Sequence, residues 1–290
     1  MRVFVLAFLF LQNGGAQQEA AKPLPELGLF LQGIRAHLRS DRLLLSRYTY
    51  TQKQTEHQFD KKGSLKKTIV RVYEVYPSLE AGLTYMRLIS RDGKPLSSAE
   101  LEKQDRAHDK RVREHARKLE REGTDEKTRR LAKEAEERRK EDKDIDELFQ
   151  LYQVSLVGRE NFDGHSAIQL TFQPRRDYKP KTAGAKIMMK VAGKAWFGEE
   201  DHELLRLQFE LVDTISIGLG MLARLNKGAT ATFQRRRVNN EIWLPAEARF
   251  AGTARILLLK GLRIESISEF SDYKKFSVSS TVTFSDRKNP

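Results

Sequence analysis

Residues 203–212 read ELLRLQFELV, and this stretch decides how the rest of the chain is interpreted. Its apolar side chains alternate with Arg206, Gln208 and Glu210, which is the period-two pattern of a strand with one wet face. The neighbouring strand candidates are 194–197, 228–237 and 241–251, with two more ending at Phe276. We therefore expect Gly193–Phe276 to form one antiparallel sheet.

Further strands and a helix are expected on the N-terminal side of this sheet. The additional strand candidates are 47–59, 65–76, 83–90, 152–160 and 165–173, and turn residues separate the members of each hairpin. Apolar residues between Leu27 and Leu38 follow helical spacing, with polar residues on the other side. Such a helix would pack against the sheet or, if the sheet is an open barrel, act as its plug.

A long charged segment interrupts the strands. Ser97–Glu100 has the pattern of a capping box, and the chain that follows to Asp146 is helical in character and about two-thirds charged. Gly123 and Thr124 break the run, which suggests a glycine stop and a threonine N-cap. We expect a helical hairpin inserted at 98–147. It is either a solvated insertion between two strands or a protruding arm for a partner.

The segment Thr214–Leu225, TISIGLGMLARL, matches neither the strand period nor the helix period. Loops are normally polar and exposed, so an apolar loop of this length needs cover. Two interpretations remain open. The segment folds over the core as a plain loop, or it forms a flexible lid on an apolar cavity.

Composition and the start of the chain indicate export. The chain has 290 residues, no Cys and a formal net charge of +13. Met1-Arg2 followed by the apolar run Val3–Leu11 is typical of a signal peptide, because the run is too short to cross a bilayer. A buried strand is the alternative interpretation. We expect a signal peptide at 1–16, a disordered lead-in at 17–25, and one soluble β-rich domain at 26–290.

Export affects which partners the positive net charge indicates. An exported protein rarely meets nucleic acid, so its basic surface more plausibly faces anionic lipid, glycan or an acidic partner. The absence of Cys also excludes structural disulfides, thiolate metal sites and a lipobox cysteine. The chain is therefore expected to be exported, with possible peripheral contact to an anionic membrane surface and no nucleic-acid partner.

The sequence contains no recognisable catalytic motif. Its six histidines are scattered, and it lacks the zinc-protease, nucleophile-elbow, P-loop and dinucleotide patterns. The carboxylates around Glu199–Glu203 fall on a hairpin turn without the spacing of a calcium loop, and His202 reads as part of that turn. The sequence predicts a protein that is not an enzyme and takes no cofactor or metal.

Several of these motifs resemble a known group, the periplasmic outer-membrane lipoprotein-sorting proteins of the LolA/LolB-like superfamily. The resemblance is carried by Ala195-Trp196-Phe197 before an acidic turn, the Leu204–Leu211 strand, Asn240–Pro245, Asp163-Gly164 leading into Ile168–Phe172, and Ser271–Phe276. Arg47–Thr51 and Tyr73–Pro77 resemble longer members that carry a charged helical insertion. The similarity covers most of Arg47–Phe276 apart from the charged segment.

This resemblance implies an α+β, mainly antiparallel fold: a curved open half-barrel sheet with covering helices and an apolar interior that holds acyl chains. The implied partners are lipid or lipoprotein acyl chains. Candidate wall residues are Phe209, Leu211, Ile215, Ile217, Leu219, Met221, Leu222, Phe233, Trp243, Phe250 and Leu258. The same positions are equally typical of an ordinary core.

The functional expectation is therefore a periplasmic carrier that binds lipid or lipoprotein in an apolar concave sheet. The alternative is a non-enzymatic envelope scaffold that binds a protein partner through the charged helical arm.

Overall fold

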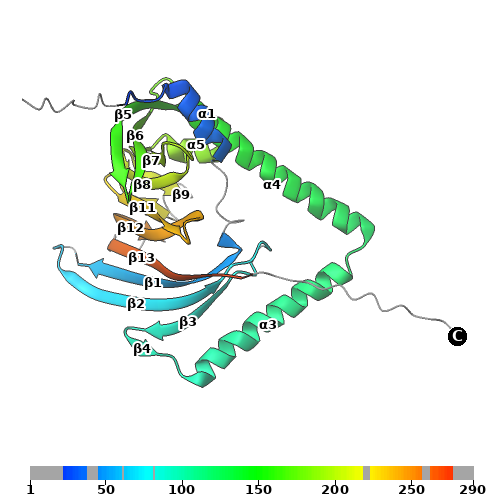
Figure 1. Cartoon of the computed structure of the whole chain (residues 1–290). Coiled ribbons are helices and arrows are strands. Elements are labelled where there is room, and N and C mark those ends of the chain that lie inside the picture. Colours follow the sequence, from blue (N-terminus) through cyan, green and yellow to red (C-terminus); the bar gives the residue numbers. More distant parts are fainter. Residues whose placement is uncertain are drawn as a thin grey trace, which may run out of the picture.

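A computed structural model describes residues 22–37, 45–60, 62–80, 82–217, 223–256 and 262–276. The chain folds into a strongly curved sheet that is open on one side, with helices on the open side (Figure 1). The strand pairs are antiparallel, and the strands follow the order β4-β3-β2-β1-β13-β12-β11-β8-β7-β6-β5. The expected α+β fold class, an open half-barrel with covering helices, is confirmed.

The elements have the following bounds. The helices are α1 (Leu27–His37), α3 (Ser98–Glu120), α4 (Thr124–Leu151) and α5 (Ala183–Met188). The first strands are β1 (Tyr48–Phe59), β2 (Leu65–Tyr76), β3 (Tyr85–Arg91), β4 (Lys94–Pro95), β5 (Tyr152–Phe162), β6 (His165–Pro174), β7 (Val191–Gly198) and β8 (Leu204–Leu211). The last are β9 (Ile215–Ile217), β10 (Ala223–Leu225), β11 (Thr230–Val238), β12 (Ile242–Ile256) and β13 (Leu262–Lys275).

The apolar segment 214–225 is not a plain loop in its described part. Residues 215–217 and 223–225 form an antiparallel ribbon, β9–β10, and β10 pairs with the end of β12. The ribbon extends the sheet locally, which satisfies backbone groups that a plain loop would leave unpaired. Residues 218–222 lie outside the described residues, so whether this segment opens as a lid stays a prediction.

The main core lies between α1 and the strands β6 and β7. Phe30 and Ile34 of α1 are 3% and 2% exposed, and they pack on Ile168, Ala195 and Phe197 of the sheet. Both helix residues stand on one face, as the spacing from Leu27 onward predicts. The helix therefore covers the sheet, as expected.

The charged segment forms two long helices that connect the opposite edges of the sheet. β4 lies at one end of the strand order and β5 at the other, and α3 and α4 are the chain between them. Figure 1 shows the helices meeting at an elbow instead of lying side by side, so that they span the open side of the half-barrel. Because α3 and α4 bridge distant strands, the two helices together form a strap across the opening of the half-barrel. This strap is also an exposed arm.

The helix caps confirm one prediction and correct another. Ser97 caps α3 and Glu100 bonds back to it, which is the expected capping box. Thr124 was expected to cap the next helix, but it is the first helical residue of α4, and Gly123 takes the cap position without a side-chain hydrogen bond. Among the described residues, no helix is both long and apolar enough to span a membrane.

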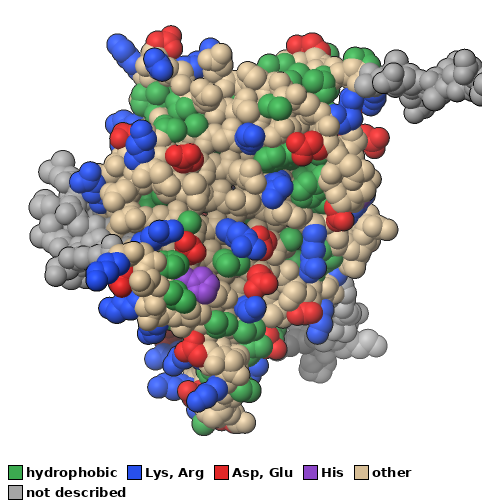
Figure 2. Space-filling model, turned by 90° about the vertical axis from the view of Figure 1, so that its left-hand side faces the viewer, with side chains coloured by type: hydrophobic (Ala, Val, Ile, Leu, Met, Phe, Trp, Pro, Cys, Tyr) green, Lys and Arg blue, Asp and Glu red, His purple; other side chains and the backbone are tan. Residues whose placement is uncertain are grey.

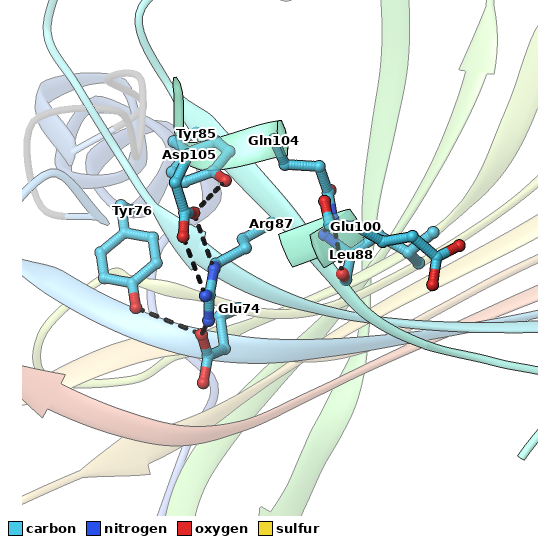
Figure 3. A network of polar contacts seen from close by, with 8 residues as sticks. All are labelled: Glu74, Tyr76, Tyr85, Arg87, Leu88, Glu100, Gln104 and Asp105. Carbon is cyan, nitrogen blue, oxygen red and sulfur yellow. Dashed lines mark hydrogen bonds and ion pairs between the residues drawn. The ribbon is translucent and has the colours of Figure 1, made fainter. Parts of the chain in front are cut away.

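The strap is attached to the edge strand β3 by polar contacts (Figure 3). Arg87 donates to both carboxylate oxygens of Asp105 on α3 at 2.9 and 3.0 Å, and the Tyr85 hydroxyl donates to the same carboxylate at 2.7 Å. The Gln104 amide accepts from the Leu88 backbone N–H and donates to the Leu88 carbonyl, both at 3.0 Å. The glutamine thus occupies the place of a neighbouring strand and protects the sheet edge.

Replacing Gln104 by Leu is expected to loosen this attachment. The Leu88 backbone groups lose their partners, which costs about 1–3 kcal/mol when the groups remain covered. Native-state hydrogen exchange should show faster exchange of the Leu88 amide. The matched control is Glu102→Leu on an exposed position of the same helix, where Leu88 exchange should stay unchanged; equal acceleration in both variants would contradict the role of the amide pair.

Candidate functional site

A cavity of about 500 Å³ lies between the concave face of the sheet and the helices. This volume is typical of ligand pockets, which span roughly 300–1,000 Å³. All of the described residues that line it are hydrophobic. They are Leu31, Ile34, Leu148, Phe149, Tyr152, Val154, Leu170, Phe172, Ile187, Met188, Val191, Ala195, Phe197, Leu204, Leu207, Phe209, Leu211, Ile215, Leu225, Ala229 and Phe250.

Strands form one side of the cavity wall, and helices form the cover on the other side. Strands β5 to β8 supply most of the sheet side through inward-facing residues, and three helices each contribute two residues to the cover. Those cover residues are Leu31 and Ile34 of α1, Leu148 and Phe149 of α4, and Ile187 and Met188 of α5. The β9–β10 ribbon adds Ile215 and Leu225 at a further side.

Tyr152 contributes the single side-chain hydroxyl among the lining residues, and this hydroxyl is already bonded. It donates to the backbone carbonyl of Met188 at 2.9 Å. Burial raises the pKa of Tyr152, so the phenol stays neutral at any physiological pH. Among the described residues that line it, the cavity therefore presents no charged or unpaired side-chain group to an occupant, and the favourable interaction they offer is burial of apolar surface.

The outer surface has a different character. Figure 2 shows the face on the left of Figure 1, where basic and acidic side chains are interspersed and hydrophobic side chains occur in small groups. A sheet with one apolar and one polar face is the usual result of alternating sequence. The concave face differs from the outer face because its side chains are apolar. They border a cavity and are only partly packed against one another.

The predicted wall residues divide into three groups. Phe209, Leu211, Ile215 and Phe250 line the cavity. Leu219, Met221, Leu222 and Leu258 lie outside the described residues, and so does the side chain of Ile217. Phe233 and Trp243 lie in the described part but do not line the cavity. Lipid binding by the first group stays a prediction.

Phe233 and Trp243 are displaced for identifiable reasons. Phe233 pairs with the cavity residue Leu207, but the Arg235 guanidinium lies 5.8 Å from its ring. Trp243 packs in a separate cluster with Trp196 and Leu205, and its indole N–H donates to Asp201 at 3.0 Å.

None of the wall residues on β5, β6 and β7 was predicted from the sequence. The signal was present in Phe172, Ala195 and Phe197, which alternate within apolar strands, but nothing in the sequence showed that these strands face a space. Ile187 and Met188 are apolar residues of the short helix α5. Their position at the cavity could be inferred only once α5 was placed against the sheet.

A polar clamp holds the N-terminal segment and α1 over the cavity. Arg159 of β5 donates to both oxygens of Glu199 at 2.7 and 2.8 Å, and the Ser166 hydroxyl donates to Glu199 at 2.6 Å. Arg159 also donates to the carbonyls of Lys22 and Pro23, just before α1. The guanidinium of Arg159 is the main reason why the pKa of Glu199 is lowered from 4.5 to about 2.

The turn between β7 and β8 contacts α1 directly. His202 lies against α1, with its ring 5.0 Å from that of Phe30 and 6.0 Å from that of His37. A Cβ atom at Gly33 would lie 2.4 Å from the His202 ring. His202, expected to be a simple turn residue, is therefore part of the contact that seats the cover helix.

Whether Gly33→Ala raises or lowers the stability of the fold tests how closely α1 packs against His202. In an isolated helix, Gly→Ala stabilises by about 1 kcal/mol. Gly33→Ala should instead destabilise the fold by about 1–3 kcal/mol, because the new methyl group overlaps His202. Gly28→Ala, on the exposed side of α1, serves as the control and should be neutral or stabilising in chemical denaturation. A stabilising Gly33→Ala would show that α1 is not seated this closely.

The end of α4 is fixed beside α5 by a buried carboxylate. Glu147 is 5% exposed and accepts from the backbone N–H groups of Lys181 and Thr182 and from the Tyr178 hydroxyl. Burial alone would raise the pKa of Glu147, but these hydrogen bonds outweigh it and hold the pKa below its ordinary value. The carboxylate is thus a structural anchor for the loop before α5.

The described residues also contain no group of three or more His, Asp or Glu side chains placed to hold a metal ion. The carboxylates at the β7–β8 turn are used in other ways. Glu199 belongs to the clamp, and Asp201 accepts from Trp243.

No family model matches the sequence, and no curated protein matches it either. Among solved structures, the chain is similar to one described as an outer membrane lipoprotein-sorting protein domain from Vibrio parahaemolyticus, at 11% identity and a TM-score of 0.30, covering 87% of this chain and 95% of that one. It is also similar to a DUF1329 family protein from Desulfovibrio piger, at 13% identity and a TM-score of 0.27, covering 87% and 95%.

A third similar structure is a LolA superfamily protein from Nitrosomonas europaea, at 9% identity and a TM-score of 0.27, covering 88% of this chain and 96% of that one. The first and third of these descriptions name the group that the sequence motifs resemble. At such identities and TM-scores the likeness assigns no ligand or partner, which must be argued from the geometry of this chain.

Proposed function

We propose that this protein is a non-enzymatic carrier that holds an acyl chain of a lipid or lipoprotein in the cavity between the sheet and helices α1, α4 and α5. The observation that supports the proposal is the cavity itself, about 500 Å³ with an entirely hydrophobic lining. Burial of one methylene group contributes roughly 0.8 kcal/mol, so a chain of about sixteen carbons could gain on the order of 10 kcal/mol before the costs of association.

The proposal includes export. Residues 1–16 have the composition of a signal peptide, and a carrier of membrane-derived acyl chains would act in the periplasm. N-terminal sequencing of the mature protein tests this part separately. Cleavage after Ala16 is the expected result, and a retained Met1 would contradict export through this segment.

Titration with a fluorescent long-chain fatty acid tests the binding claim. Saturable binding at one chain per protein is expected, with competition by unlabelled fatty acid. A short-chain acid of the same charge serves as the control and should compete weakly, because it buries few methylene groups. Absence of saturable binding, or equal competition by both acids, would contradict the proposal.

A protein-interaction role through the strap is the second candidate. It is favoured by one observation: α3 runs for 23 residues and none of them is buried. Away from the face that contacts β3, this polar helix offers an exposed surface for a partner. A protein that captures a partner through the strap and binds no fatty acid would favour this alternative.

A further inference from the structure

The segment between β6 and β7 carries a concentration of positive charge. Residues 175–190 read RRDYKPKTAGAKIMMK, which includes six basic residues and one acidic residue. The segment consists of a loop followed by α5. In the two strap helices, by contrast, basic and acidic residues nearly balance and several of them pair within the same helix.

Most of these cations face solvent. The exposed ones are Arg175, Arg176, Lys179, Lys181 and Lys186. Among the ion pairs of the described residues, none involves these five side chains, whereas Lys190 pairs with Asp213 at 3.1 Å. The acidic side chains nearby are Asp177 in the same loop, Asp144 beside Gly184, the buried Glu147, which accepts backbone N–H groups of the segment, and Asp213, which pairs with Lys190. The surface therefore keeps a positive excess.

The same segment also forms part of the cavity wall. Ile187 and Met188 of α5 line the cavity, while Ile187 remains 40% exposed. One short helix thus joins the exposed basic surface to the apolar interior. A basic surface with an exposed apolar side chain combines the two interactions that hold proteins to anionic bilayers, charge attraction and shallow insertion.

The segment is held in a defined position. Glu147 accepts two backbone N–H groups from Lys181 and Thr182, and the Thr182 hydroxyl accepts from the Ala185 N–H at 3.0 Å. At the other end, Tyr152 donates to the Met188 carbonyl. The basic side chains therefore project from a fixed base next to the cavity.

We propose that residues 175–190 dock the protein on an anionic lipid surface, with α5 at the membrane and the cavity next to the bilayer from which an acyl chain enters or leaves. This inference rests on the proposed carrier function for its purpose. The docking itself depends on charge complementarity between the segment and anionic headgroups. Phosphatidylglycerol-type lipids provide such a surface, and neutral phosphatidylcholine does not.

Co-sedimentation of the full chain with vesicles tests the docking. The test variant carries Lys179→Gln, Lys181→Gln and Lys186→Gln. The control carries Lys62→Gln, Lys66→Gln and Lys67→Gln on the exposed β1–β2 hairpin, which removes the same charge. Binding to vesicles that contain phosphatidylglycerol should weaken at least about tenfold in the test variant and by about twofold or less in the control.

Three further measurements complete the test of docking: salt dependence, lipid dependence and fatty-acid binding. Wild-type binding should fall with added salt and should be weak on pure phosphatidylcholine. Fatty-acid binding in the cavity should be unchanged in the lysine variant, so a failure of docking and a failure of the carrier function are distinguishable. Equal weakening in both variants, equal binding to both kinds of vesicle, or capture of an acidic protein in place of lipid would overturn the proposal.

Discussion

Leu207→Trp is expected to reduce fatty-acid binding by at least tenfold while the protein remains folded. Leu207 is a partly buried residue of β8 that packs at the edge of the main core and lines the cavity. An indole in place of the isobutyl group occupies space that an acyl chain would need. The loss of even two or three buried methylene contacts corresponds to about 1.6–2.4 kcal/mol, which is more than tenfold in affinity.

The matched control for this substitution is Thr232→Trp. Thr232 of β11 pairs with Gln208, so its side chain stands on the face opposite to Leu207. Titration of both variants with the fluorescent fatty acid should show weak binding for Leu207→Trp and unchanged binding for Thr232→Trp. Circular dichroism and thermal unfolding establish that both are folded. If Leu207→Trp binds as well as the control does, the ligand does not occupy this cavity.

Glu199→Gln is expected to lower the free energy of unfolding by about 1–3 kcal/mol. The carboxylate is 9% exposed and receives the bidentate Arg159, the Ser166 hydroxyl and the Lys22 ammonium. An amide of the same shape keeps the packing but loses the charge-assisted bonds, which are the strong ones in such a cluster. Because the clamp holds the chain before α1, the cover of the cavity should loosen as well.

The pH dependence of this variant provides an independent reading. The pKa of Glu199 is lowered from 4.5 to about 2, so the ionised form stabilises the folded state above about pH 4.5. That contribution, roughly 1–2 kcal/mol after allowance for solvent screening, is lost as the pH falls from about 4.5 to 2. The stability difference between the wild type and Glu199→Gln should therefore shrink over this range.

Glu200→Gln is the matched control for both readings, because Glu200 is the exposed neighbour in the same turn. Chemical denaturation at neutral pH should leave it within about 0.5 kcal/mol of the wild type. If Glu200→Gln and Glu199→Gln have the same effect, the general charge of the turn is responsible and the clamp is not.

Local rules predicted much of the fold. The alternation along 203–212 placed Leu207, Phe209 and Leu211 on one face, and all three line the cavity. The capping box at Ser97 located the start of α3. Each of these depends on residues close together in the chain, which is where period and capping arguments are strongest.

Other features depend on long-range pairing and could not be read from a single sequence. Leu205 was counted with the same alternating set, yet a bulge opposite Trp196 and Phe197 places it in the cluster with Trp243. A bulge adds one residue and shifts the alternation, and no residue type marks it here. The strap lies between two strands in the chain, as expected, but only the strand order shows that these strands, β4 and β5, lie at opposite edges of the sheet.

The candidate site, too, could be predicted only in part from local sequence rules. Apolar residues on strands predicted a hydrophobic face, but a filled core and a cavity need the same residue types. The difference arises from how the helices are placed over the sheet, which involves contacts such as Gly33 with His202 and Arg159 with the carbonyls of Lys22 and Pro23. These contacts join positions far apart in the chain, so the space that they leave open could be recognised only in the folded structure.

Native mass spectrometry of the protein purified from its own cell envelope, followed by organic extraction, tests the central claim most directly. The account predicts a population carrying one lipid or acylated species per chain, absent from Leu207→Trp purified in the same way, with an acyl chain identified in the extract. A clean unliganded mass that stays unchanged after incubation with phospholipid or fatty acid would contradict it, because an accessible apolar cavity of this size should take up an acyl chain.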